Sequence, residues 1–184
     1  EAVEGGAVCF KSLQFSLSRM GTVWKGESDS VRREGLQMKQ KRKAVCRVLS
    51  QTEMAPGIFD MQIETDLGAQ ALAGQFVMVY PKAESTLLPR PISICEAEDT
   101  KLRIVYRVAG KGTEEFSGYG PGVQIALMGP LGNGLPGWEA DGKRAVLLGG
   151  GIGIPPLLQL AKSLPGRQTI LAGYRDHRLF LKED

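Results

Sequence analysis

The chain has 184 residues, with 23 Lys and Arg against 20 Asp and Glu, and 42% of its residues are hydrophobic. This composition is ordinary for a soluble globular protein and argues against a disordered chain. The length is sufficient for one large domain or two small ones, each with a buried core.

The basic excess is confined to the N-terminal segment. Residues 1–43 hold nine Lys or Arg and five Asp or Glu, a net charge of +4, whereas the rest of the chain has a net charge of −1. The body therefore lacks the basic field that would attract nucleic acid. Residues 1–37 show no period of two or 3.6, and their acidic residues argue against a targeting peptide. We expect a disordered or non-native leader there, followed by a solvated basic run at 39–43.

The cysteines, Cys9, Cys46 and Cys95, form no Cys-x-x-Cys pair, so this chain by itself supplies neither a zinc ribbon nor an iron–sulfur site. Because the cysteines are few and odd in number, they also argue against a disulfide scaffold. The lack of such a scaffold indicates the reducing cytoplasm. Residues 145–161 lack charge, but glycine and proline fill five of the seven positions 149–155. A strand, a turn and a helix explain this segment better than a membrane span.

Six short apolar or alternating runs follow the leader, at 44–50, 58–65, 75–80, 91–95, 102–108 and 123–128. Turn residues such as Pro56-Gly57 and Pro121-Gly122 separate them. Strands at this spacing predict a small six-stranded antiparallel β barrel within residues 38–140. A short helix is expected to begin at Thr113, with the threonine as its cap and acidic residues in the first turn.

The pattern changes after Trp138. Residues 144–148 indicate a buried strand, 149–154 a glycine turn, 155–164 a helix with proline in its first turn, and 169–174 a second strand. This is a βαβ unit, which requires a parallel sheet. The segment 141–184 has fewer residues than the ~50 that a domain usually needs. We therefore expect them to be the N-terminal part of an incomplete α/β nucleotide-binding domain.

Two motifs in the barrel carry candidate binding chemistry. Arg90-Pro91-Ile92-Ser93 opens a strand, where the forked guanidinium can reach a phosphate and the serine offers a hydroxyl on the same face. Val105-Tyr106-Arg107 precedes a glycine-rich turn that contains Gly112 and Thr113, a place where backbone N–H groups converge on a pyrophosphate. Taken singly, each also fits an ordinary surface salt bridge or a plain β-to-α connection.

The third motif lies between the predicted strand and helix of the α/β unit. It reads Gly149-Gly150-Gly151-Ile152-Gly153-Ile154-Pro155 and does not match the spacing of the Gly-x-Gly-x-x-Gly dinucleotide fingerprint. Four glycines nevertheless allow a backbone to approach a ligand at the carboxyl end of a parallel strand. A purely structural turn would need only two of them.

Together and in this order, the motifs resemble the ferredoxin-reductase superfamily, in which a flavin-binding barrel precedes a nicotinamide-binding α/β domain. Within it, the segment from about Lys43 onward is most similar to the electron-transfer subunits of NAD-linked dihydroorotate dehydrogenases. A further mark of this resemblance is the run from Met128 to Gly134, and another is the double proline after the glycine turn.

The resemblance implies that the barrel motifs hold FAD: Arg90, Pro91, Ile92 and Ser93, with Val105, Tyr106, Arg107, Gly112 and Thr113. The flavin ring is expected against Ser93 and the Tyr106 strand, and the pyrophosphate at Gly112 and Thr113. The glycine turn, Gly149, Gly150, Gly151, Ile152, Gly153, Ile154 and Pro155, is expected to line NAD. No side chain is then required as a catalytic acid, base or nucleophile. The only histidine, His177, fits a surface position.

By the same resemblance, electrons from dihydroorotate would pass from an FMN-containing catalytic partner subunit through a two-iron two-sulfur cluster to FAD and NAD⁺, in pyrimidine biosynthesis. The four cysteines that bind the cluster in relatives are absent from this chain. Two alternatives remain open at this point. One is a reductase subunit of another complex, of the hydrogenase or ferredoxin:NADP reductase type, and the other is an inactive flavin-binding fragment.

Overall fold

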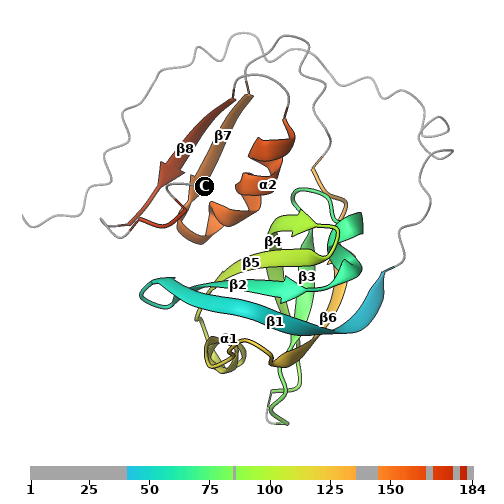
Figure 1. Cartoon of the computed structure of the whole chain (residues 1–184). Helices are drawn as coiled ribbons and strands as arrows, with labels where there is room; N and C mark the ends of the chain where they lie inside the picture. Colours follow the sequence, from blue (N-terminus) through green and yellow to red (C-terminus); the bar gives the residue numbers. More distant parts are fainter. Residues whose placement is uncertain (1–40, 85, 136–144, 165–167, 176–178, 182–184) are drawn as a thin grey trace, which may run out of the picture. The chain divides into compact units, whose positions relative to one another are not determined.

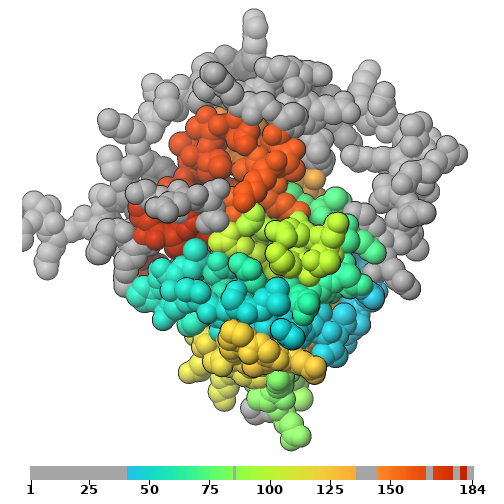
Figure 2. All heavy atoms as spheres, in the orientation of Figure 1, coloured from blue at the N-terminus to red at the C-terminus, as the bar shows by residue number. Residues whose placement is uncertain are grey.

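A computed structural model of the chain describes residues 41–84, 86–135, 145–164, 168–175 and 179–181. The other residues are drawn in grey in Figures 1 and 2. The expected leader at 1–37, Trp138 and His177 lie outside the described residues.

Strands β1 to β6 form a closed antiparallel barrel, in the order β1-β2-β5-β4-β3-β6 around its circumference (Figure 1). Strands β1 and β6 pair from Arg42 opposite Gly129 to Arg47 opposite Gln124, which closes the barrel. The expected six-stranded antiparallel barrel is therefore confirmed. The bounds are β1 Arg42–Ala55, β2 Ile58–Glu64, β3 Phe76–Tyr80, β4 Arg90–Glu98, β5 Lys101–Arg107 and β6 Gln124–Leu131.

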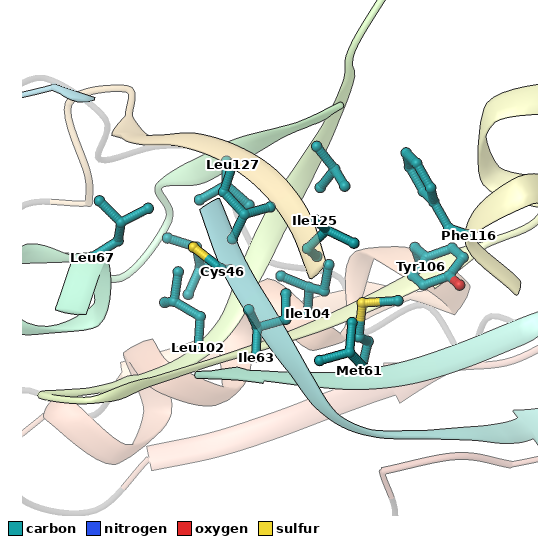
Figure 3. Close-up of a cluster of buried hydrophobic side chains, with 14 residues drawn as sticks. Cys46, Met61, Ile63, Leu67, Leu102, Ile104, Tyr106, Phe116, Ile125 and Leu127 are labelled. Carbon is teal, nitrogen blue, oxygen red and sulfur yellow. The ribbon is translucent and has the colours of Figure 1, made fainter. Parts of the chain in front are cut away.

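The apolar side chains whose alternation predicted the strands also fill the interior of the barrel. In β5, Leu102, Ile104 and Tyr106 point inward, and each is at most 1% exposed. Aliphatic side chains of the other strands meet them in one cluster, to which Phe116 adds a ring (Figure 3). Burial of this apolar surface is the main term that stabilises the barrel, because each buried aliphatic or aromatic side chain contributes about 1.5–3 kcal/mol.

Strands β4 and β6 each end three residues later than expected, at Glu98 and Leu131, and two further elements differ from their expected bounds. Strand β1 continues to Ala55, and its pairing with β2 has register shifts after Val48 and after Glu53 that let the long strand bend around the barrel. Helix α1, Lys111–Ser117, begins before Thr113, so the expected cap position was wrong. The threonine hydroxyl still serves the helix start from the third helical position, because it accepts hydrogen bonds from the N–H groups of Ala109 and Gly110.

The C-terminal part forms the expected βαβ unit. Strand β7, Ala145–Gly150, pairs in parallel with β8, Gln168–Gly173, and helix α2, Pro155–Ser163, connects them after the 3₁₀ turn η2, Gly151–Gly153. The segment that lacks charge is thus strand, turn and helix. Among the described residues, no helix is long and apolar enough to cross a membrane.

The expectation that the first parallel strand is buried was wrong. Val146 is 52% exposed and Leu148 is 68% exposed, while their neighbours in β7 are half-buried. The strand therefore has one covered face and one open face within the described structure. Sequence alone could not show this, because an uninterrupted apolar run has no period that marks a solvent side.

The barrel and the α/β unit belong to the same compact unit. Helix α2 contacts β4, where the orange and yellow-green atoms meet in Figure 2. The turn η2 contacts β5. Five buried side chains lie outside the barrel core cluster and on these elements: Cys95, Val105, Ile154, Leu160 and Ala161. Since Cys95 and Val105 alternate with inward-facing neighbours, they lie on the outer face of the barrel, where α2 and η2 cover them.

Candidate functional site

Arg90 and Gly112 come from different elements and are in direct contact. A Cβ atom built on Gly112 would lie 2.7 Å from Nε and 3.0 Å from Cζ of Arg90. The guanidinium therefore rests on the backbone of the first turn of α1, in the space that any larger residue would fill. This brings the first predicted motif against the second, as a shared phosphate site requires.

The Arg90 side chain is held by a single hydrogen bond, since Nη1 donates to the carbonyl oxygen of Leu88 at 2.8 Å. Among the described residues no other group accepts from this guanidinium. Its remaining N–H donors are thus available to an anion. The Nε and Nη2 donors, which bond to no described acceptor, suit this arginine to bidentate recognition of phosphate.

The loop that leads to Arg90 is anchored by α1. Glu115 accepts hydrogen bonds through Oε1 from the backbone N–H groups of Lys82 at 2.6 Å and Ala83 at 3.2 Å, and from the Tyr119 hydroxyl. Burial opposes ionisation of Glu115, but these hydrogen bonds outweigh it and hold its pKa below the ordinary value. The carboxylate fixes the position of the Arg90 loop relative to the turn of Gly112.

The side chain of Tyr106 lies in the core of the barrel. Its ring is 1% exposed, stacks on Phe59 at a centroid distance of 5.8 Å, and meets the edge of Phe116 at 6.2 Å. Its hydroxyl donates to Oε1 of Gln51 at 2.8 Å, and burial raises the pKa of the phenol, so it remains a donor. Any contact of Tyr106 with a cofactor on the outer face would come from its backbone.

Gln51 extends this interaction to the end of α1. Its amide nitrogen donates to the carbonyl oxygens of Phe116, Ser117 and Tyr119, at 3.0, 3.1 and 2.7 Å. Gln51 thereby links β1 to the C-terminal end of α1, where the Phe116 carbonyl also accepts a hydrogen bond from the N–H of Tyr119, at 2.9 Å. Sequence reasoning missed both Gln51 and Glu115, because each acts on residues more than thirty positions away and no local spacing marks them.

The remaining barrel positions gather at one end of β4 and β5. Ile94 pairs with Ile104 in this antiparallel pair, so the Arg90–Ser93 end of β4 lies beside the Tyr106–Arg107 end of β5. On the other side, Ser93 pairs with Phe76 of β3. Ser93 and Arg107 are exposed, whereas Cys95 is fully buried. The structure thus brings together the motifs that sequence placed on separate strands.

The four glycines of the turn have different reasons to be glycine. A Cβ on Gly149 would lie 2.8 Å from Leu157 Cδ1 and 3.1 Å from Ile154 Cα, so this position is required for packing on α2. Gly151 has a φ of +51°, which favours glycine. A Cβ on Gly150 or Gly153 would meet no described atom within 4 Å. Two glycines satisfy the turn, and the other two leave an open backbone surface that fits a close-lying ligand.

A pocket connects the glycine turn with the barrel. It is lined by Arg107 and the β1–β2 turn on the barrel side, and by Gly151, Ile152 and Arg175 on the other. Tyr174 completes it, held by a hydrogen bond from its hydroxyl to the carbonyl oxygen of Phe180 at 2.6 Å. Two arginines beside an open glycine turn form a site suited to an anionic ligand.

The run from Met128 to Gly134 has a packing role. A Cβ on Gly129 would lie 2.8 Å from Val77 Cγ1, and one on Gly134 would lie 2.9 Å from Leu72 Cβ. Gly132 and Gly134 have positive φ values of 87° and 71°. The glycines therefore allow β6 and its following loop to lie close to β3.

Known proteins were compared with this chain. No model of a protein family matches it. It is 45% identical over 120 residues to the dihydroorotate dehydrogenase B (NAD(+)) electron transfer subunit of Streptococcus mutans, an alignment covering 64% of this chain and 46% of the relative. The chain thus spans about half the length of the curated relatives it matches.

Solved structures agree with this similarity. The structure of an NADH-dependent reduced ferredoxin–NADP oxidoreductase superposes with a TM-score of 0.68 and 27% identity, over 76% of this chain and 52% of that one. A flavohemoglobin from Malassezia yamatoensis, solved with bound FAD and heme, gives a TM-score of 0.61 at 27% identity, over 74% of this chain and 39% of that one. The resemblance seen in the motifs is confirmed: the chain has a ferredoxin reductase-like fold and is homologous to electron transfer subunits of dihydroorotate dehydrogenase B.

Proposed function

We propose that this chain binds FAD on the barrel and NAD at the glycine turn, and that it serves as the electron-transfer subunit of a dihydroorotate dehydrogenase in pyrimidine biosynthesis. The similarity to relatives of that name supports the assignment. The two binding surfaces, one on the barrel and one at the turn, supply the places that such a role requires.

The observation that carries the proposal is the contact between Arg90 and Gly112. It joins the two barrel motifs into one surface, where the free guanidinium donors bind the FAD phosphates beside the backbone of Gly112 and Thr113. Ser93, with Pro91 and Ile92, lines the flavin ring from β4. Arg107 and the backbone of Val105 and Tyr106 would line it from β5, because the side chains of Val105 and Tyr106 are buried.

At the second surface, Gly150 and Gly153 let the nucleotide lie against the backbone, since no described side chain occupies that space. Gly149 and Gly151 shape the turn, and Ile152, Ile154 and Pro155 form its apolar wall before α2. Arg107 faces the pocket next to Gly151 and balances the negative charge of the ligands. When bound, a flavin supplies hydride and single-electron chemistry that no side chain here provides.

The proposal assigns no proton transfer to the protein. The described residues orient the cofactors, exclude water from the barrel side of the flavin and neutralise phosphate charge. An FMN-containing catalytic subunit would deliver electrons to this chain in the cytoplasm, and in relatives a two-iron two-sulfur cluster would lie between them. None of the cluster's cysteines is present in this sequence, so the cluster is not assigned to this chain.

The experiment that tests the flavin site is titration of the purified chain with FAD, followed by its visible spectrum and fluorescence. Arg90→Ala is expected to weaken FAD binding about 10-fold or more, because a hydrogen bond to a charged group contributes about 1.5–3 kcal/mol. Arg47→Ala is the matched control, since within the described part of the chain that exposed arginine has only a long ion pair with Glu64, at 3.8 Å. Equal affinities of the two variants, or a wild-type chain without flavin bands, would overturn the proposal.

The partner is tested separately by a coupled assay. Adding the chain to an FMN-containing dihydroorotate dehydrogenase catalytic subunit is expected to confer dihydroorotate-dependent reduction of NAD⁺. NADH-dependent reduction of ferredoxin in place of this reaction would indicate a reductase subunit of another complex. That second function is favoured by one observation, the 27% identity to an NADH-dependent reduced ferredoxin–NADP oxidoreductase.

A further inference from the structure

Four charged side chains outside the proposed cofactor surfaces form a continuous network. Arg103 of β5 binds Asp60 of β2 through Nε, at 3.1 Å, and through Nη2, at 2.9 Å. Its Nη1 donates to Glu96 Oε2 of β4 at 2.6 Å, and Lys162 of α2 donates to the other oxygen, Oε1, at 2.5 Å. The network thus runs across three barrel strands and ends on the helix of the α/β unit.

Its barrel end is largely buried and its helix end is exposed. The side chains of Arg103 and Asp60 are 16% and 15% exposed, whereas that of Lys162 is 52% exposed. Burial opposes ionisation of Glu96, but Lys162 and Arg103 outweigh it and hold its pKa below the ordinary value. Arg103 fixes the carboxylate of Glu96, which presents its second oxygen to the helix as a prearranged acceptor.

Two members of the network, Glu96 and Lys162, lie on the elements that carry the two binding surfaces. Strand β4 begins with Arg90 and continues to Glu96, and α2 begins directly after the glycine turn and ends near Lys162. The Lys162–Glu96 pair therefore connects the end of α2 to the strand of the flavin motif. Between them lies the buried layer under α2, which includes Cys95 and Leu160.

We infer that the Asp60–Arg103–Glu96–Lys162 network positions α2 on β4, and thereby keeps the glycine turn beside Arg107, where both line one pocket, as transfer between a bound nicotinamide and a bound flavin would require. These four are positioning residues, because none of them lines the pocket of Arg107 and Gly151. The part of this inference that concerns transfer rests on the proposed function. The part that concerns α2 does not.

Cys95 offers a reporter that needs no cofactor. It is fully buried on the outer barrel face covered by α2, whereas Cys46 is 5% exposed inside the barrel core. Pulse labelling of the full chain with N-ethylmaleimide, read for each cysteine by peptide mass spectrometry, separates lifting of α2 from unfolding of the barrel. Lys162→Met is expected to raise the labelling rate of Cys95 about threefold to fivefold, the effect of losing one partly exposed ion pair, and to leave that of Cys46 unchanged.

Two further variants define the result. Lys162→Arg keeps the charge and is expected to restore slow labelling. Lys101→Met is the matched control, because its pair with Glu98, at 3.3 Å, lies on the barrel and involves no residue of α2. Equal Cys95 labelling in Lys162→Met and wild type, or a parallel increase at Cys46, would overturn the inference.

The effect on transfer is measured by the bleaching of bound flavin after mixing with NADH. Lys162→Met is expected to lower the limiting rate about threefold while FAD occupancy stays at the wild-type level, and Lys162→Arg to recover it. An unchanged limiting rate in a variant that labels faster would refute the positioning of the glycine turn. A wild-type chain that binds no flavin contradicts the proposed function, and the labelling experiment still decides whether the network holds α2.

Discussion

Gly112→Ala separates the stability of the barrel from its binding chemistry. The added Cβ would lie 2.7 Å from Arg90 Nε, whereas ordinary contact begins at 3.4 Å, so the guanidinium must retreat by about 0.7 Å. The obstructing atoms are at the end of a flexible side chain, and alanine is favoured over glycine in a helix by up to about 1 kcal/mol. We therefore expect no loss of stability in this variant.

FAD binding should weaken in the same variant. The Arg90 fork would leave the position in which it can bind a phosphate, and a lost charge-assisted hydrogen bond of about 1.5–3 kcal/mol corresponds to an increase of roughly 10- to 150-fold in Kd. The measurement is fluorescence titration with FAD alongside urea denaturation. Gly110→Ala is the control, since a Cβ there meets nothing within 4 Å. Equal FAD affinity in the two variants, with both folded, would refute the assignment of the Arg90–Gly112 contact.

Four other substitutions probe the surrounding structure. Tyr106→Phe removes the hydroxyl that donates to Gln51 at 2.8 Å and should lower the free energy of unfolding by about 1–2 kcal/mol, measured by urea denaturation; an unchanged midpoint would contradict this. Glu115 has a depressed pKa, so its stabilising effect is present above the unfolded value near 4.5 and is lost as the pH falls through the lower folded value. Glu115→Gln should therefore flatten the decline of Tm below about pH 4.5, and parallel Tm profiles would count against it. Gly149→Ala should lower the Tm, because the added Cβ meets the backbone of Ile154 at 3.1 Å. Gly150→Ala should leave the Tm unchanged and weaken NADH binding, because a Cβ there meets no described atom within 4 Å. A lower Tm for Gly150→Ala than for Gly149→Ala would contradict this account of the turn.

Much of the fold was accessible from local pattern. The alternation of β5 and the turns at Pro56-Gly57 and Pro121-Gly122 predicted the barrel strands to within a few residues at most ends. The parallel pairing of β7 and β8 followed from a strand, a helix and a second strand in succession. The exposed face of β7 could not be predicted, because valine and leucine, the residue types at Val146 and Leu148, also occupy buried positions.

The candidate site was predictable as a set of motifs but not as an arrangement. Arg90, Gly112 and the glycine turn stand out by residue type, and the resemblance they carry named the cofactors. Gln51 and Glu115, which hold α1 and the Arg90 loop in place, do not stand out. Their partners lie far away in sequence, so only the closed barrel shows that they meet.

The sequence by itself determined which elements form and in what order, because strand alternation, glycine and proline turns and helix periodicity act within a few residues of each other. The tertiary structure alone decided which side chains face one another. It places the Tyr106 side chain in the core and Arg107 outside it. It also brings Arg90 into contact with Gly112 and pairs Lys162 with Glu96. The physical reason is strand register: a shift of one residue would exchange the two faces of a strand, and register is set by pairing between distant segments as the barrel closes.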